Sequence, residues 1–229
     1  MAIQVEIEKH PLLELAAICC HFPLLLGSDP SPSWLTDQLI SDSPDHIRSE
    51  EGRSAIRRML RHGGYRPAGR GKPASEYLMA AARRQSLSSI NPAVDAINAA
   101  SLHGGVPISV IDLALTTPAF RVGICGEGER YVFNSAGQEI DLEGLLCLHD
   151  AAGPCANGVK DAQRTKTGPQ TEKVLGVLWG SVERVQDLQG TLVRLSDLMT
   201  RLGGHLEEVE RCFKEGPGGE FSANGRASR

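Results

Sequence analysis

Basic residues are concentrated in one short stretch of this 229-residue chain. Between Arg53 and Arg84, where Glu76 is the only acid, lie nine of the 24 Lys and Arg residues: Arg53, Arg57, Arg58, Arg61, Arg66, Arg70, Lys72, Arg83 and Arg84. A local positive field of this kind attracts phosphate groups, and such binding weakens steeply with added salt. The alternative is a solvated helix face that is balanced by the acids preceding it, which are Asp42, Asp45, Glu50 and Glu51. On this pattern alone the two interpretations carry equal weight.

A second candidate is formed by Asn91, Asp95 and Asn98, which follow one another at spacings of four and three. In a helix these spacings place all three side chains on one side, where they can orient a ribose or an amino group. Asn91 is also explained by capping alone, because Asn followed by Pro92 is typical of a helix start. From spacing alone we favour an ordinary solvated helix face.

A third candidate is the polar segment from Asp161 to Thr167, which combines hydroxyls and an amide with two cations, Arg164 and Lys166. It comes shortly before an apolar segment that we predict to be a core strand. Loops that a rigid scaffold holds in place often carry binding residues. We therefore favour a ligand-binding role for this segment over a merely solvated turn.

Familiar catalytic and metal-binding patterns are absent from the sequence. It contains no G-x-S-x-G, no H-E-x-x-H and no P-loop motif, and its six cysteines form no C-x-x-C pair. We therefore expect no zinc site, no other metal and no cofactor. The cysteines are typical of reduced thiols in a cytosolic protein, and no signal peptide is expected because no basic region precedes an apolar run. These features predict a cytoplasmic protein that does not enter a membrane.

Periodicity predicts which elements position these residues. Apolar and polar residues alternate over 3–7, which is typical of a half-buried strand, whereas the apolar run 13–22 fits either a helix or a buried strand. Capping residues, Ser33, Ser75 and Asn91 among them, and helical spacing predict helices at 33–40, 50–62, 75–84 and 92–102. Leu and Val at spacings of three and four predict a longer amphipathic helix over 182–202.

The part of the chain after residue 105 is rich in predicted strands. We expect them at 107–115, 119–125, 130–133, 145–148 and 173–179. The polar stretch 150–170 is expected to be a long loop, and loops of this length inside a domain are usually functional or mobile. Helices followed by strands in this arrangement indicate the α+β class.

The run from Ser89 to Leu102 (SINPAVDAINAASL), followed by Gly105 to Leu113 (GVPISVIDL), resembles the B3/B4 domain of the phenylalanyl-tRNA synthetase β subunit. The pattern of that family is I-N-P-x-V-D-x-x-N-x-x-S-L, followed by a Gly-x-Pro-Ile turn. The resemblance extends over about residues 53–180. It is closest to the stand-alone form of the domain, which also carries an Arg-rich helical segment before the motif.

This resemblance implies a B3/B4-like α+β fold in which helices flank a central, mostly antiparallel sheet. It divides the chain into an N-terminal segment that joins the main domain (1–52), an editing core (53–180), a C-terminal amphipathic helical segment (181–215) and a disordered tail (216–229). We expect the helix at 182–202 to pack on its own domain rather than to mediate self-association.

The resemblance also implies a partner, the aminoacylated 3′ end of tRNA. In the synthetases this domain hydrolyses tRNA mischarged with tyrosine, and stand-alone forms look like trans-acting counterparts. The pocket residues implied here are Asn91, Asp95, Asn98, Ser109, Gln163 and Thr165. The residues implied to contact tRNA phosphates are Arg57, Arg58, Arg61, Arg83, Arg84, Arg164 and Lys166.

Two positions depart from the pattern of the synthetases. Ser109 stands where their editing pocket has a His, and Gln163 stands where they carry a Glu. Both changes remove a titratable group. Two functions are therefore left open, a trans-editing deacylase that hydrolyses mischarged tRNA and a module that binds tRNA or an amino acid without catalysis. The deacylase needs no protein nucleophile, because a positioned water and polar groups around the ester carbonyl can suffice.

Overall fold

The apolar run that fitted either a helix or a strand is a strand at the centre of the molecule. In the computed structural model, which describes residues 2–40 and 49–214, this strand is β2 (Leu13–His21). It pairs antiparallel with β9 (Lys173–Ser181), which pairs with β3 (Ile108–Asp112) on its other side. A short strand, β10 (His205–Glu207), completes this four-stranded sheet in the order β10-β2-β9-β3.

The continuous apolar character of β2 follows from its position between two cores. Leu13 and Leu15 face a core shared with the second sheet, whereas Ala16 and Ile18 face a core shared with helices. Successive side chains of a strand point to opposite faces. A strand that is buried on both faces along most of its length therefore has too few polar positions to reveal its period of two.

The second sheet is mixed and has the order β11-β1-β4-β7-β8. Its strands are β1 (Ile3–Ile7), β4 (Phe120–Ile124), β7 (Leu146–Asp150), β8 (Gly153–Asn157) and β11 (Val209–Phe213). β1 lies between β11 and β4 and is parallel to both, whereas the β4–β7 and β7–β8 pairs are antiparallel. A two-stranded hairpin, β5 (Arg130–Val132) and β6 (Glu139–Asp141), projects beside this sheet.

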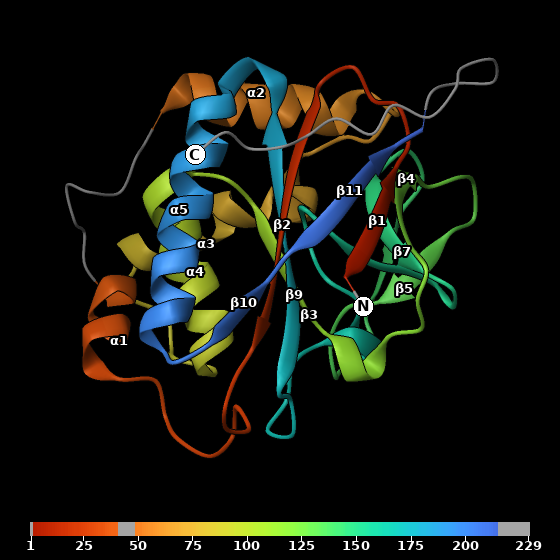
Figure 1. Cartoon of the computed structure of the whole chain (residues 1–229). Helices are drawn as coiled ribbons and strands as arrows, with labels where there is room; N and C mark the ends of the chain where they lie inside the picture. The colour runs from red at the N-terminus through yellow and green to blue at the C-terminus, as the bar shows by residue number, and fades with distance from the viewer. Residues whose placement is uncertain (1, 41–48, 215–229) are drawn as a thin grey trace.

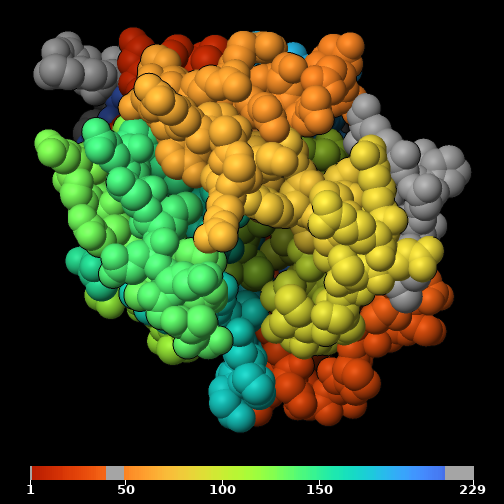
Figure 2. Space-filling model, turned by 180° about the vertical axis from the view of Figure 1, so that it is seen from behind, coloured from red at the N-terminus to blue at the C-terminus, as the bar shows by residue number. Residues whose placement is uncertain are grey.

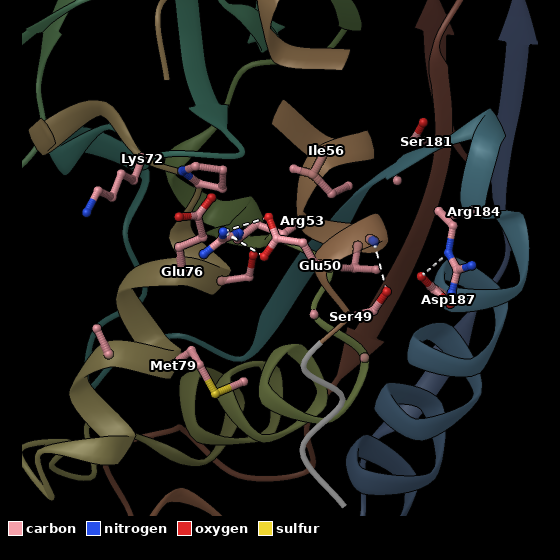
Figure 3. A pocket seen from close by; sticks show the side chains of 18 of the residues that line it. Ser49, Glu50, Arg53, Ile56, Lys72, Glu76, Met79, Ser181, Arg184 and Asp187 are labelled. Carbon is pink, nitrogen blue, oxygen red and sulfur yellow. Dashed lines mark hydrogen bonds and ion pairs between the residues drawn. The ribbon is translucent and has the colours of Figure 1, made fainter. Parts of the chain in front are cut away.

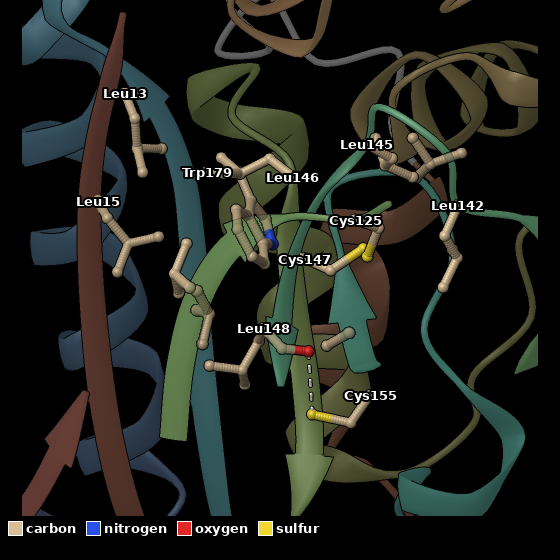
Figure 4. Packing of buried hydrophobic residues seen from close by; sticks show 14 of the residues in the cluster. Leu13, Leu15, Cys125, Leu142, Leu145, Leu146, Cys147, Leu148, Cys155 and Trp179 are labelled. Carbon is tan, nitrogen blue, oxygen red and sulfur yellow. Dashed lines mark hydrogen bonds between the residues drawn. The ribbon is translucent and has the colours of Figure 1, made fainter. Parts of the chain in front are cut away.

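The helices divide the molecule into layers. α1 (Ser33–Ile40), α3 (Ala74–Arg83), α4 (Pro92–Gly104) and α5 (Val185–Arg201) lie on one side of the four-stranded sheet, and the mixed sheet lies on the other (Figure 1). α2 (Glu50–Arg61) crosses one end of both sheets. Leu15, Trp179 and Leu148 meet in the core between the sheets (Figure 4). The α+β class is thus confirmed.

Several local predictions are confirmed. Asn91 caps α4 by accepting a hydrogen bond from the N–H of Val94 at 3.0 Å, and Gly105 ends the helix with a left-handed φ of 72°. The helix predicted over 182–202 is present as a single 3₁₀ turn (Val182–Arg184) followed by α5. Its buried residues Leu188, Leu195 and Leu198 belong to the core against α4 and the four-stranded sheet, so this stripe packs within the domain.

Other predictions were wrong in their details. Ser75 does not cap α3; Pro73 precedes the helix, and the N–H of Ala74 donates to the carbonyl of Gly158 at 2.8 Å, so a tertiary contact replaces the cap. The stretch 150–170 contains β8 and a 3₁₀ turn (Gln163–Thr165) rather than only a loop. β6, β10 and β11 were not predicted, because these segments are short and partly exposed. β10 and β11 also pair with strands distant in sequence, whereas β6 pairs with the neighbouring β5.

Some expectations concern residues that the structure does not describe, namely Asp42, Asp45 and the tail 216–229. Within 2–40 and 49–214, no helix combines the length and the apolar character that crossing a membrane requires.

Candidate functional site

The N-terminus of α4 contacts the polar loop that precedes β9. The side-chain amide of Asn91 donates to the hydroxyl of Thr167 at 3.1 Å, which brings two separate sequence motifs together. Asp95 is fully buried, and its carboxylate accepts hydrogen bonds from Ser31 and Ser89, each at 2.5 Å, and from the N–H of Ile90 at 3.0 Å. Asp95 therefore ties together the segments around α4, whereas Asn98 is partly exposed.

Ser109 belongs to a buried polar cluster at the start of β3. Its hydroxyl donates to the carbonyl of Asn157 at 3.0 Å and accepts from Nε1 of Trp179 at 2.9 Å. The side chain of Asn157 accepts from the N–H groups of Val159 and Lys160 at 2.8 and 2.9 Å, which shapes the turn after β8. The cluster thus fixes the beginning of the segment 157–167, which we call the Asp161 loop.

Asp161 occupies the centre of this loop. Its two carboxylate oxygens accept hydrogen bonds, each of 3.3 Å, from the N–H groups of Asn157 and Val110. Burial raises the pKa of Asp161 to about 6, although these N–H groups and nearby Ser109 favour the charged form. A small part of the residue remains exposed. Asp161 therefore combines partial access to solvent with a carboxylate whose pKa lies near neutrality.

Two lysines flank Asp161 in the same loop. The ammonium of Lys160 lies 3.9 Å from the centre of the Phe133 ring, and the ammonium of Lys166 donates to the carbonyl of Phe133 at 2.5 Å. Burial lowers the pKa of both lysines; Arg70 acts in the same direction on Lys160, whereas Asp161 acts in the opposite direction on Lys166. The loop therefore carries a mixed set of partly desolvated charges.

This face of the molecule is hollowed. Figure 2 shows a depression between the orange segment near residue 70, the green hairpin and the yellow segment ahead of α4, with olive-green atoms near residue 100 at its bottom. The Asp161 loop contacts each of these walls: the N–H of Ala74 donates to the carbonyl of Gly158 at 2.8 Å, Lys160 packs on the ring of Phe133, and Thr167 accepts from Asn91. We take the Asp161 loop and this depression as the candidate functional site.

The remaining residues predicted in this segment have structural contacts. The guanidinium of Arg164 donates to the carboxylate of Asp150 at 2.9 and 2.7 Å and to the carbonyl of Gly153 at 2.9 Å. Burial opposes the ionisation of Asp150, but Arg164 and two backbone N–H groups outweigh it and hold its pKa below the ordinary value. Thr165 is fully buried and donates to the carbonyl of Cys155 at 3.1 Å. Gln163 is partly exposed.

The basic residues divide into paired and unpaired groups. Arg57 forms a two-point ion pair with Glu76 at 2.6 and 2.7 Å, and Arg58 pairs with Glu183. Arg61, Arg83 and Arg84 are exposed, and none of them forms an ion pair with any residue in the described ranges. The unpaired residues retain the positive field that the sequence pattern predicted.

A second hollow of about 300 Å³ lies between α2, α3, the end of α4 and the start of α5 (Figure 3). We call it the α2–α3 pocket. Its lining includes two ion pairs between neighbouring residues, Arg53 with Glu50 at 2.7 Å and Arg184 with Asp187 at 2.8 Å. All three carboxylates of the lining, those of Glu50, Glu76 and Asp187, are thus paired with an arginine. Of the residues predicted to contact tRNA, Arg83 is part of its lining.

Sequence reasoning named the segment from Asp161 to Thr167 but did not single out Asp161 as a site residue. The signal was weak, because a single Asp in a polar segment gives no indication of burial. Asn157 and Tyr131 were missed entirely, because the hydrogen bond from Asn157 to the Tyr131 hydroxyl joins a strand end to a hairpin. A cluster of Cys125, Glu129 and His149 was missed for the same reason, since its members come from separate elements.

Comparison with known proteins places this geometry in a family context. The family model for the B3/4 domain matches residues 68–179. An N-terminal fragment of the phenylalanyl-tRNA synthetase β-subunit from Pyrococcus horikoshii is similar in structure, with a TM-score of 0.52 at 12% sequence identity. The match covers 93% of this chain and 53% of that fragment, so the chain spans about half of the fragment's length. At this identity the likeness shows the fold. No curated protein matches the chain.

Proposed function

We propose that this chain, which contains a B3/4 domain at residues 68–179, binds the aminoacylated 3′ end of tRNA and hydrolyses the ester of a mischarged amino acid. The observation that carries the proposal is the position of Asp161. Its carboxylate has a pKa of about 6, the residue as a whole is partly exposed, and it lies in a loop that contacts all three walls of the depression. The resemblance to the editing domain of the synthetases supplies the substrate class.

The reaction requires a base that removes a proton from water. In our proposal the carboxylate of Asp161 accepts that proton while the water oxygen attacks the carbonyl carbon of the aminoacyl ester. The tetrahedral intermediate then collapses, the ester C–O bond breaks, and the ribose oxygen leaves with the proton that Asp161 had accepted. A general base is most effective when its pKa lies near the working pH. Asp161, at about 6, is mainly ionised at neutral pH and meets this requirement.

Asp161 can compensate for the two positions, Ser109 and Gln163, at which this chain departs from the synthetase pattern. The carboxylate that the synthetases carry at the position of Gln163 is replaced here by one two residues earlier in the same loop. Ser109, which stands in place of their His, holds Trp179 and the backbone of Asn157. In this proposal Ser109 positions the loop, and Asp161 acts on the water.

The cations have two separate roles in the proposal. Lys160 and Lys166, whose ammonium groups lie against Phe133 at one wall of the depression, contact the terminal nucleotides of tRNA in this proposal. Arg61, Arg83 and Arg84 have no ion-pair partner among the described residues and lie on exposed surface, where they can contact phosphates farther along the tRNA. Because the net charge of the chain is −4, only the surface around these cations should attract the tRNA backbone.

The test is a panel of tRNAs, each charged with a correct or an incorrect amino acid and incubated with the wild type and Asp161→Asn. We expect the wild type to accelerate the loss of at least one mischarged species, and we expect Asp161→Asn to be slower by about 100-fold or more. Asp187→Asn, which removes a carboxylate from the α2–α3 pocket, is the matched control and should retain activity.

Two results would contradict the proposal. One is that no mischarged tRNA decays faster with the wild type than without protein. The other is that a correctly folded Asp161→Asn, checked by its thermal unfolding, retains wild-type activity.

A binding module without catalysis is the second candidate, and one observation favours it. The carboxylate oxygens of Asp161 and the hydroxyl of Ser109 already hold backbone and side-chain partners within the fold. In that case the wild type and Asp161→Asn bind tRNA equally well, and neither hydrolyses it. Measuring binding and hydrolysis on the same tRNA samples separates the two candidates.

A further inference from the structure

Three side chains that can bind a metal converge at the end of β4, away from the Asp161 loop. Cys125 follows β4, Glu129 lies just before β5, and His149 belongs to β7. Their ligand atoms all lie within 4.8 Å of one another. The Sγ of Cys125 and the Oε1 of Glu129 each lie 3.6 Å from the Nε2 of His149. Cys125 and His149 are buried, and Glu129 is partly exposed.

Both partners of His149 approach the same ring nitrogen. A thiol–imidazole–carboxylate relay needs the thiol on one nitrogen and the carboxylate on the other. Here Nδ1 is buried and has no hydrogen-bond partner among the described residues, so no carboxylate orients the ring from that side. The arrangement is therefore unsuited to nucleophilic catalysis. Three ligand atoms that all lie within 4.8 Å of one another are instead suited to an ion.

The two distances to the Nε2 of His149 agree with tetrahedral coordination. Zinc bonds of about 2.3 Å to sulfur and about 2.0 to 2.1 Å to nitrogen place the two ligand atoms about 3.5 Å apart when they share one tetrahedral ion. The Sγ–Nε2 separation of 3.6 Å matches this value without rearrangement. A thiolate, a carboxylate and a divalent cation also sum to zero charge, which keeps the cost of a largely buried ion low.

The surroundings hold the ligands in place. The N–H of Gly126 donates to the Oε2 of Glu129 at 2.5 Å, which leaves Oε1 directed toward His149. Outer hydrogen bonds of this kind orient the ligands of metal sites. Arg121, the β-sheet partner of His149, is the nearby cation, and its charge is balanced by an ion pair with Glu8 at 2.6 Å.

We propose that Cys125, Glu129 and His149 bind one zinc ion, with the fourth coordination position left to water. The expectation of no zinc site rested on the missing C-x-x-C pattern, whereas these ligands come from three elements. The ion fastens the turn 126–128 to β7. Tyr131, two residues beyond Glu129, donates to the carbonyl of Lys160 in the Asp161 loop. Zinc therefore stabilises one wall of the candidate site, and this inference holds whether or not the protein hydrolyses tRNA.

The test uses the full chain with its thiols reduced and all metal removed by chelation. Zinc is titrated in by calorimetry, and cobalt(II) is added to a parallel sample to detect thiolate coordination by its charge-transfer absorption. We expect one ion per chain, a higher unfolding temperature with zinc, and a thiolate–cobalt band. Glu129→Gln, a change at a partly exposed residue, should weaken zinc binding by about tenfold or more, and Cys125→Ser should abolish the band.

Glu143→Gln and Cys212→Ser are the matched controls, because they remove an exposed carboxylate and a thiol outside the cluster. Both should bind zinc like the wild type. The proposal is overturned if the reduced wild type binds no stoichiometric zinc. It is also overturned if Glu129→Gln binds zinc as tightly as the wild type, since the ion then lies elsewhere. That second result does not require the buried Cys125→Ser variant to fold.

Discussion

The α2–α3 pocket and the Asp161 loop are both lined by charged residues, but the charges are arranged differently. In the pocket, Arg53 pairs with Glu50 and Arg184 pairs with Asp187, each within three residues along the chain. Asp161 forms no ion pair within the described part of the chain, and backbone N–H groups hold its carboxylate. Pairing leaves the pocket with two cations, Lys72 and Arg83, that have no ion-pair partner among the described residues, and with no unpaired carboxylate. The loop keeps a charge that a substrate or a water can use.

An unpaired carboxylate such as that of Asp161 also affects the stability of the folded protein. A partly buried carboxylate without an ion-pair partner raises the free energy of the folded state whenever it is ionised, and its raised pKa expresses that cost. Perturbed groups of this kind are found most often at functional sites, although structural networks also produce them. The smaller number of charges in the Asp161 loop is thus more informative than the larger number around α2 and α3.

The largest expected effect is on the pH dependence of stability. Asp161 has a pKa of about 6 in the folded protein and 3.8 as its ordinary value. The folded state therefore binds the proton more tightly, so the stability that this group contributes is full below pH 3.8 and is lost as pH rises through 6. The difference amounts to about 3 kcal/mol. Relative to Asp161→Asn, the wild type should lose most of this free energy of unfolding between pH 4 and 7.

Urea unfolding of both proteins across this range measures the difference. If the free energy of unfolding of the two proteins has the same pH dependence, ionised Asp161 does not destabilise the folded state. The Asp161 loop would then not differ from the α2–α3 pocket in this respect.

The second effect compares two ion pairs. Arg164→Met removes the partner of Asp150, whose carboxylate is completely buried, and should destabilise the protein by about 2 kcal/mol, less than for a fully buried pair because Arg164 is partly exposed. Arg58→Met breaks an exposed pair with Glu183 and should change stability far less. Urea midpoints provide the measurement. Equal effects of the two substitutions would mean that burial does not distinguish these regions.

The smallest effect concerns tRNA affinity. Arg83→Gln with Arg84→Gln removes two unpaired cations and should lower the slope of log affinity against log salt by about 2, or about 1 per residue. Arg57→Gln with Arg58→Gln removes cations that Glu76 and Glu183 already neutralise, so its slope should stay nearer that of the wild type. Filter binding at several salt concentrations tests this. A larger effect of the second pair would identify α2 as the tRNA-binding face.

The sequence predicted most of the elements that position the site. Asn91 and Pro92 marked the start of α4, and the spacing of Leu188, Leu195 and Leu198 marked α5, because capping and helical periodicity are local signals. The strands that it missed, β6, β8, β10 and β11, are short, and β10 and β11 pair with partners distant in sequence. Register of that kind is not encoded in a segment of three to five residues.

The motif from Asn91 to Asp112, with the polar segment up to Thr167, was enough to identify the B3/B4 fold, because those residues follow one another in order along the chain. Tertiary structure alone decided the state of Asp161, which depends on N–H groups from Val110 and Asn157 and on burial. It also decided which arginines are neutralised, and it brought Cys125, Glu129 and His149 together. The physical reason is the same in each case: desolvation and pairing depend on neighbours in space, and a sequence lists only neighbours along the chain.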